Sequence, residues 1–193
     1  MAAAELYLLR HGATEWARNG RHTGRTDLPL LAEGEAEASA LAPALTAVAF
    51  DAVLVSPLQR ARRTAELAGL GAGAQISADL MEWDYGDYEG ITTAAIRSQQ
   101  PAWSLWSDGC PGGEQAHQVQ IRCERLIEQA LAIAPAGRVA LVAHGHILRA
   151  LAGTWLGLGA QGGALLSLAT ATVSVLGFER EQRVILRWNS RLV

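Results

Sequence analysis

Three short apolar runs constrain the fold of this chain more than any other feature of its sequence. They are residues 6–9, 52–55 and 138–143, the last of which opens with Arg138, and each stops at polar or charged residues. Runs of this length are typical of buried strands, and a stretch with helical spacing follows each of them. Strands that alternate with helices form right-handed crossover units and a mostly parallel sheet. We therefore predict an α/β fold: a three-layer sandwich with helices on both faces of the sheet.

The helices can be placed by their apolar period and their end signals. They are expected at residues 33–49, from Ser56 to about Gly69, at about 92–99, at 114–134, and after the third strand to about Leu156. Pro43 should kink or shorten the first helix. Ser56 is expected to cap the second helix, with Pro57 at its first position. Two β-rich runs, 171–178 and 183–188, predict a hairpin that adds an antiparallel edge strand.

The composition fits one domain over residues 1–193. Half of the residues are hydrophobic, which is enough for a core of this size. An irregular, cap-like segment rich in Trp and turn residues is expected at about 76–113. The net charge is −3, so the basic surface typical of nucleic-acid or anionic-membrane binders is missing, and neither partner is expected.

The sequence also bears on the compartment. No 18 apolar residues run together, and the apolar start is interrupted by Glu5 and Arg10, so neither a membrane span nor a signal peptide is predicted. The two cysteines, Cys110 and Cys123, form no CxxC pair and are expected to be free thiols. A cytoplasmic location is the expectation.

Reactive side chains lie at or just beyond the ends of the predicted strands. Arg10 and His11 end the first strand, Arg60 lies one turn into the helix after the second, and His144 ends the third. In open α/β sheets such groups gather in the crevice outside the carboxyl ends of the strands. A single histidine there is more often structural. Two histidines and two arginines together predict a site for a phosphoryl group.

Four sequence blocks resemble the histidine phosphatase superfamily, also called the phosphoglycerate mutase-like family. They are residues 9–16 with their Arg-His-Gly signature, 56–65, 82–90 and 143–146. The blocks follow the family order and span nearly the whole chain. The Arg-His-Gly signature alone would be weak, but the four together are specific.

The resemblance implies a role for each central residue. His11 would be the nucleophile that forms a covalent phosphohistidine. Arg10, Arg60 and His144 would hold the phosphoryl group with it and stabilise the transition state, without a metal or a cofactor. Their charges are expected to lower the pKa of His11 and keep it neutral. Glu82 would protonate the leaving alkoxide and then activate water.

Five outer positions match family residues around the substrate. Thr23 and Gly24 match a loop that contacts it, although an ordinary turn explains them equally well. Tyr85, Gly145 and His146 match residues that line the pocket.

The chain also departs from the family pattern. Ala17 stands where the family has a phosphate-contacting Asn, and Asn19 cannot be assumed to replace it. Further departures are Ala13, Leu31 and Gln115. His22 and His117 are expected at the rim or in solvent. Because of these differences, the sequence does not fix the full set of side chains that contact the phosphate.

Residues 82–90 and 106–110 resemble a branch of small phosphatases, which includes bacterial acid phosphatases and sedoheptulose-bisphosphatase-like enzymes. The mutase branch has a longer insert with basic residues, whereas between Glu82 and Glu114 this chain has only Arg97. We therefore expect hydrolysis of small phosphate esters, of the acid phosphatase type. A cofactor-dependent phosphoglycerate mutase is the alternative. Four further arginines are expected either to widen the positive region or to be solvated, namely Arg18, Arg21, Arg25 and Arg97. The sequence leaves open which substrate is used and whether the protein forms a homodimer.

Other classes fit less well. A nucleotide-binding oxidoreductase is not supported, because the Gly-rich run at 69–73 follows a helix instead of a strand. A metallophosphatase needs a cluster of carboxylates and histidines, which His144 and His146 alone do not make. A catalytically inactive phospholigand sensor would share the fold, but the five catalytic candidates favour an enzyme.

Overall fold

The computed structural model describes residues 3–191. Its middle layer is a six-stranded sheet in the order β3-β2-β4-β1-β5-β6. The strands are β1 (Glu5–Arg10), β2 (Ala52–Val55), β3 (Gln75–Ile76), β4 (Arg138–Ala143), β5 (Val173–Glu179) and β6 (Gln182–Ser190). Strands β1 to β4 pair in parallel, and β5 and β6 pair antiparallel at one side. The predicted mostly parallel sheet with an antiparallel hairpin is confirmed.

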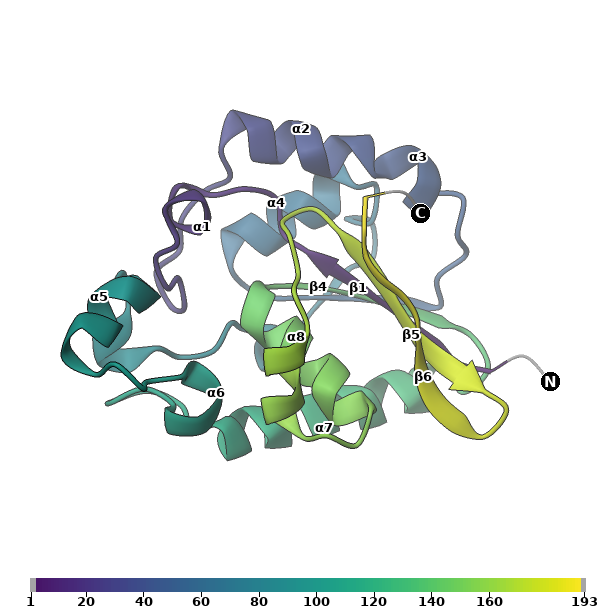
Figure 1. Ribbon diagram of the computed structural model, residues 1–193. Coiled ribbons are helices and arrows are strands. Elements are labelled where there is room, and N and C mark those ends of the chain that lie inside the picture. Colours follow the sequence, from purple (N-terminus) through teal and green to yellow (C-terminus); the bar gives the residue numbers. More distant parts are fainter. Residues whose placement is uncertain (1–2, 192–193) are drawn as a thin grey trace.

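Helices cover both faces of the sheet. The α-helices are α1 (Glu15–Asn19), α2 (Ala32–Ala40), α3 (Ala42–Leu45), α4 (Gln59–Leu67), α5 (Thr93–Gln99), α6 (Leu105–Asp108), α7 (Ala116–Ile133) and α8 (Gly145–Trp155), and the 3-10 helices are η1 (Ala78–Leu80), η2 (Gly86–Tyr88) and η3 (Ala160–Leu165). Helices α2, α3 and α4 lie on one face, and α7 and α8 lie on the other (Figure 1). The three-layer prediction is confirmed.

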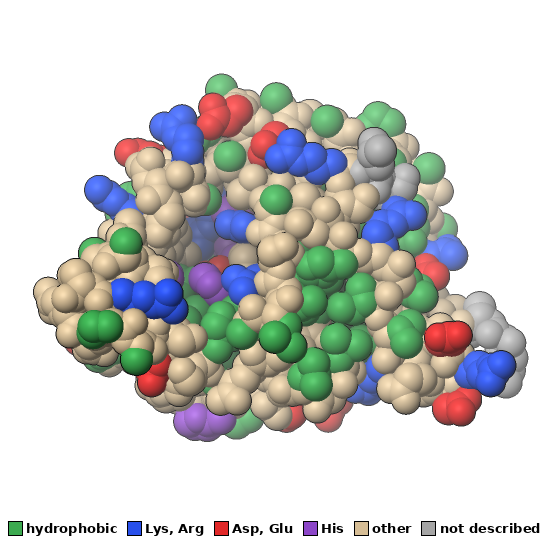
Figure 2. Space-filling model, in the orientation of Figure 1, with side chains coloured by type: hydrophobic (Ala, Val, Ile, Leu, Met, Phe, Trp, Pro, Cys, Tyr) green, Lys and Arg blue, Asp and Glu red, His purple; other side chains and the backbone are tan. Residues whose placement is uncertain are grey.

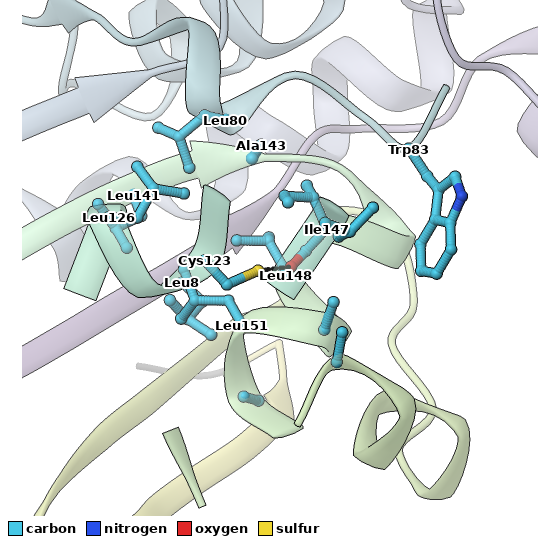
Figure 3. Packing of buried hydrophobic residues seen from close by; sticks show 14 of the residues in the cluster. Leu8, Leu80, Trp83, Cys123, Leu126, Leu141, Ala143, Ile147, Leu148 and Leu151 are labelled. Carbon is cyan, nitrogen blue, oxygen red and sulfur yellow. Dashed lines mark hydrogen bonds between the residues drawn. The ribbon is translucent and has the colours of Figure 1, made fainter. Parts of the chain in front are cut away.

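The two faces of the sheet have separate apolar clusters, and β1 contributes to both. Leu8 is buried with Cys123 of α7 and Leu148 of α8 (Figure 3). Leu9 is buried on the opposite face with Leu45 of α3. Because successive strand side chains point to opposite faces, both helix layers fix the position of β1. The residues at its carboxyl end are therefore held by a rigid frame.

The chain is interrupted as predicted near Pro43. Helix α2 ends at Ala40, and α3 begins at Ala42 with Pro43 in its first turn. Proline lacks the N–H that a continuous helix needs, but it is tolerated in a first turn. The single helix expected at 33–49 is therefore two short ones.

The predicted start of the second helix is wrong. Helix α4 begins at Gln59 instead of Pro57, and its N-terminus is capped from outside by Asp27, whose Oδ1 accepts from the Gln59 N–H at 2.8 Å. The hydroxyl of Ser56 accepts only a long hydrogen bond, 3.4 Å, from the N–H of Leu58 just before the helix, and it lies 2.7 Å from Nε2 of His144. The shorter contact of this hydroxyl is therefore the long-range one.

The segment predicted to be irregular, residues 76–113, contains the short elements η1, η2, α5 and α6. Helices α5 and α6 lie to one side of the sheet, and α6 contacts α7 and η3 (Figure 1). No helix within residues 3–191 is both long and apolar enough to cross a membrane.

Candidate active site

A cavity of about 200 Å³ opens where β1 ends and α8 begins. Figure 2 shows it as a hollow in which histidine and arginine side chains gather. Seven of the ten predicted site residues line it, namely Arg10, His11, Thr23, Glu82, Tyr85, Gly145 and His146. The other three, Arg60, His144 and Gly24, lie behind this lining and contact it. The sequence blocks therefore meet in one place.

The turn after β1 places His11 at the cavity. The backbone N–H of His11 continues the sheet by donating to the carbonyl of Ala143 at 2.9 Å. The next residue must be glycine, because a Cβ on Gly12 would lie 2.2 Å from the carbonyl oxygen of Gly34 in α2. The Gly12 N–H donates to Thr64 of α4. Both neighbouring helices thus fix the turn.

The imidazole of His11 has the form that a nucleophile needs. Its Nδ1 lies 2.7 Å from the carbonyl oxygen of Gly12. A carbonyl can only accept, so Nδ1 carries the proton and Nε2 keeps its lone pair. The pKa of His11 is well below its ordinary value, first because the ring is buried and then because of the charges of Arg60 and Arg10. The shift has the predicted direction, but burial is its larger cause.

Arg60 is completely buried, and protein acceptors bind its guanidinium. Its Nη1 donates to the carbonyl of Thr26 at 2.8 Å, and its Nη2 donates to those of Thr23 and Gly24 at 3.0 Å. Arg60 does not line the cavity. Its positive charge therefore lies beside the cavity, and its N–H groups hold the loop from Thr23 to Thr26 in place. Direct contact with a phosphate stays a prediction.

His144 is also fully buried, and both ring nitrogens are occupied. Nδ1 lies 3.1 Å from Nε of Arg60, and Nε2 lies 2.7 Å from the hydroxyl of Ser56. Burial, followed by the charge of Arg60, holds the pKa of His144 well below its ordinary value. The ring centroid is 5.1 Å from that of His11. The two histidines are brought together as predicted, but the role of His144 on phosphate is untested.

Glu82 is held against the first turn of α8. Its Oε1 accepts from the backbone N–H groups of Trp83 and Ile147, at 2.9 and 2.8 Å, and its Oε2 accepts from that of His146 at 3.0 Å. Free N–H groups and the helix dipole favour a carboxylate at this place. The residue is only 4% exposed, and it lines the cavity.

Arg10 is held less completely. Its Nη1 donates to the carbonyl of Leu168. Its Nε is buried without a hydrogen-bond partner, the one such side-chain atom in the part of the chain that the structure describes. Gly145 allows this guanidinium to approach α8, because a Cβ on Gly145 would lie 3.2 Å from the central carbon of the Arg10 guanidinium. An unpaired buried donor costs about 1–3 kcal/mol, so an anionic oxygen near it would be stabilised.

Three aromatic rings form one wall. The hydroxyl of Tyr85 lies 2.6 Å from Nδ1 of His146. Burial raises the pKa of Tyr85 and lowers that of His146, so the phenol donates and the imidazole is neutral with its proton on Nε2. The ring of His22 is 4.7 Å from that of Tyr85. His22 is 7% exposed and lines the cavity, which corrects its predicted place at the rim, whereas His117 is exposed as expected.

The loop around Gly24 is clamped from two sides. Arg60 holds its carbonyl groups, and the carboxylate of Glu89 accepts from the N–H groups of Gly24 and Thr26 at 2.9–3.0 Å. A Cβ on Gly24 would lie 2.7 Å from both the Glu89 carboxylate and the carbonyl of Trp83. These contacts fix the position of Thr23, which lines the cavity.

Ala17 lines the cavity, whereas Asn19 is exposed and does not, so Asn19 does not take the place of the family's Asn. Of the four outlying arginines, only Arg21 lines the cavity. The others are engaged elsewhere: Arg18 with Glu33, Arg25 with Asp84, and Arg97 with the carbonyl of Trp103.

A further arginine, Arg149, lines the cavity from α8 and was not among the predicted site residues. The signal was its position three residues after His146, on the same helical face. Among the residues from 3 to 191, no three His, Cys, Asp or Glu side chains are grouped so that they could hold a metal ion.

Comparison with known proteins agrees with this geometry. The model of the histidine phosphatase superfamily, branch 1, matches residues 6–191. An acid phosphatase of Mycobacterium tuberculosis is 39% identical over 180 residues, which cover 92% of this chain and 88% of that protein. A sedoheptulose 1,7-bisphosphatase of Saccharomyces cerevisiae is 33% identical over 80% of this chain and 68% of its own length.

A solved structure supports the fold assignment. The product of the open reading frame Rv3214 of Mycobacterium tuberculosis superimposes with a TM-score of 0.92 at 38% identity, over 97% of each chain. The fold and the sequence blocks thus point to the same family.

Proposed function

Because the chain is a phosphatase that belongs to the histidine phosphatase superfamily, we propose that it hydrolyses small phosphate monoesters through a phosphohistidine on His11. The observation that carries this proposal is the state of His11. Its ring is neutral, its Nδ1 proton is donated to Gly12, and its Nε2 lone pair is free at a cavity with Arg10.

In the first step Nε2 of His11 attacks phosphorus. A P–N bond forms, the ester P–O bond breaks, and the ring gains a positive charge, which the hydrogen bond to Gly12 supports. The bound phosphate dianion disfavours a second negative charge nearby, so Glu82 is protonated in the complex, and it gives this proton to the departing oxygen. In the second step Glu82 takes a proton from water, whose oxygen attacks phosphorus. The P–N bond breaks, inorganic phosphate leaves, and His11 is again neutral.

Two arginines stabilise the negative charge of the transition state in this reaction. Phosphoryl transfer spreads negative charge over the peripheral oxygens, so fixed positive charge nearby lowers the barrier. Arg10 has an unpaired buried N–H at the cavity, and Arg60 lies behind it with its charge held in place. The chemistry calls for no metal ion, and activity on an aryl phosphate is expected to survive excess chelator.

The substrate class is proposed from the size and charge of the cavity. A cavity of about 200 Å³ is smaller than the roughly 300–1,000 Å³ of pockets for drug-sized ligands, which suits a small metabolite. The names of two relatives, an acid phosphatase and a sedoheptulose 1,7-bisphosphatase, support this class. A cytoplasmic location is part of the proposal, and a homodimer stays open within it.

Hydrolysis and isomerisation can be separated directly. With 3-phosphoglycerate and a bisphosphoglycerate primer, we expect inorganic phosphate to be released faster than 2-phosphoglycerate appears. Faster isomerisation would assign the chain to the mutases, which are the alternative.

A further inference from the structure

Arg149 is anchored so that its guanidinium belongs to the cavity wall. Its Nε donates to the carbonyl of Gly163 in η3 at 3.0 Å, and its guanidinium carbon lies 4.7 Å from the ring centroid of Trp106. The ring fits there because residue 163 is glycine: a Cβ would lie 2.5 Å from Trp106. Three separate elements, α8, η3 and α6, thus hold the head of one arginine.

The charge of this anchored group is not balanced. Within residues 3–191 no carboxylate forms an ion pair with Arg149, and no hydrogen-bond acceptor meets its two terminal nitrogens. Glu82 is the acidic group that acts on it most strongly, but the oxygens of that carboxylate already accept three backbone N–H groups. By contrast, the half-buried Arg122 is paired with Glu114 at 2.7 Å.

The neighbours of Arg149 increase the need for an anion. Arg10 lines the same cavity, and the charges of the two arginines oppose each other. Arg21, which is exposed, also lines it. One phosphoryl group at His11 would occupy Arg10. A half-buried guanidinium with free donors then remains for another part of the ligand, and a planar fork of this kind binds carboxylate or phosphate oxygens in pairs.

We propose that Arg149 is a specificity-determining residue that binds a second anionic group of the substrate, a carboxylate or a second phosphate, at the end away from His11. The proposal rests on the proposed phosphatase function and goes beyond it. It predicts that phosphate esters with a second negative charge are preferred over esters of the same shape with a neutral end.

A matched pair of substrates tests this preference. 3-Phosphoglycerate and glycerol 3-phosphate have the same three-carbon chain but end in a carboxylate and a hydroxymethyl group. A second pair, fructose 1,6-bisphosphate and fructose 6-phosphate, tests a phosphate in the same role. For the wild type we expect a higher kcat/KM for the doubly anionic member of at least one pair. The pair that shows it identifies the anion, and the preference should weaken as salt is added.

The variant Arg149→Gln removes the charge. The ratio of kcat/KM between charged and neutral substrates should fall about 10- to 100-fold, the range for hydrogen bonds between charged groups, mainly through KM. Arg149→Lys keeps the charge without the fork and should retain part of the ratio. The control is Arg183→Gln: Arg183 lies over Trp155 at the same 4.7 Å but is not at the cavity, so the ratio should not change.

The outcomes separate two failures. Equal losses on both members of each pair in Arg149→Gln, or no wild-type preference in either pair, would overturn the inference and leave hydrolysis intact. Wild-type protein that hydrolyses no phosphate ester, an aryl phosphate included, would overturn the proposed function itself. If Arg149→Gln does not fold, Arg149→Lys and the salt dependence of the wild type decide: an unchanged ratio in both contradicts the proposal.

Discussion

The guanidinium of Arg60 donates from Nε to Nδ1 of His144 over 3.1 Å, in a place without solvent access. Because Nδ1 accepts, the proton of the neutral imidazole lies on Nε2 and is donated to Ser56. The same guanidinium binds three carbonyls of the loop at Thr23 to Thr26. One arginine therefore sets a tautomer and fixes a cavity wall.

Arg60→Lys tests this double role. Lysine keeps the charge, but its single ammonium cannot reach one histidine and three carbonyls in fixed directions. We expect kcat/KM on an aryl phosphate to fall about 100-fold or more, the size of effect seen when one preorganised donor is lost. The control is Arg62→Lys, because Arg62 is exposed on the same helix. Activity of Arg60→Lys close to that of the control would show that charge alone suffices.

Glu82→Gln tests the proton donor. An alkyl phosphate expels a poor leaving group that must be protonated, whereas an activated aryl phosphate needs little help. General acid catalysis contributes about 10²–10⁴-fold, so phosphorylation by the alkyl ester should slow by much of that factor and phosphorylation by the aryl ester far less. Single-turnover bursts must isolate this step, because Glu82 is also expected to activate water in the second one.

The hydrogen bonds of Glu82 complicate this substitution. The amide NH₂ of glutamine would face the N–H of His146, which now donates to Oε2. A lost hydrogen bond of this kind costs about 1–3 kcal/mol of stability, so unfolding is measured in parallel with Glu128→Gln, an exposed control on α7. Equal slowing with both esters would leave Glu82 a merely structural role, and Asp84 would be the next acid to test.

The buried histidines predict a dependence of stability on pH. His11, His144 and His146 have pKa values well below the ordinary 6.5. Below about pH 6.5 these histidines bind protons in the unfolded chain but stay neutral in the folded chain. The free energy of unfolding is therefore highest above about pH 6.5 and decreases as the pH falls. Each histidine contributes a slope of up to about 1.4 kcal/mol per pH unit.

Urea unfolding between about pH 7 and about pH 5.5 measures this slope. His146→Gln should make it shallower, because one refused proton is removed. His117→Gln should leave it as in the wild type, because His117 is exposed. The same slope in both variants would mean that His146 titrates alike in folded and unfolded chains.

The strand ends could be predicted from the sequence because local patterns determine them. The runs at 6–9, 52–55 and 138–143 are apolar enough to be buried, and parallel pairing brings Arg10 and His144 to one edge of the sheet. The positions of Thr23 and Glu82 followed from the family resemblance alone. Neither lies in a periodic segment, and long-range partners, Arg60 and the first turn of α8, hold them.

Other features depended on contacts that no local pattern reveals. Ser56 has the sequence signal of a helix cap, but the buried His144 uses its hydroxyl and Asp27 caps the helix instead. His22 was expected near solvent because it lies in a polar loop, but it packs against Tyr85 and Trp103. Such errors arise where a tertiary partner competes with a local one.

The central claim is that the phosphoryl group passes through His11, and trapping the intermediate tests it most directly. Wild-type protein mixed with labelled phosphate ester and denatured in the steady state should retain phosphate that is acid-labile and base-stable, and peptide mapping should locate it at His11. The variant His11→Ala should retain none and should lose turnover, because the other two histidines that line the cavity are engaged through a ring nitrogen: Nδ1 of His146 accepts from the hydroxyl of Tyr85, and Nε2 of His22 lies 3.4 Å from the hydroxyl of Thr93. Label on another residue, or substantial hydrolysis by His11→Ala, would contradict the account.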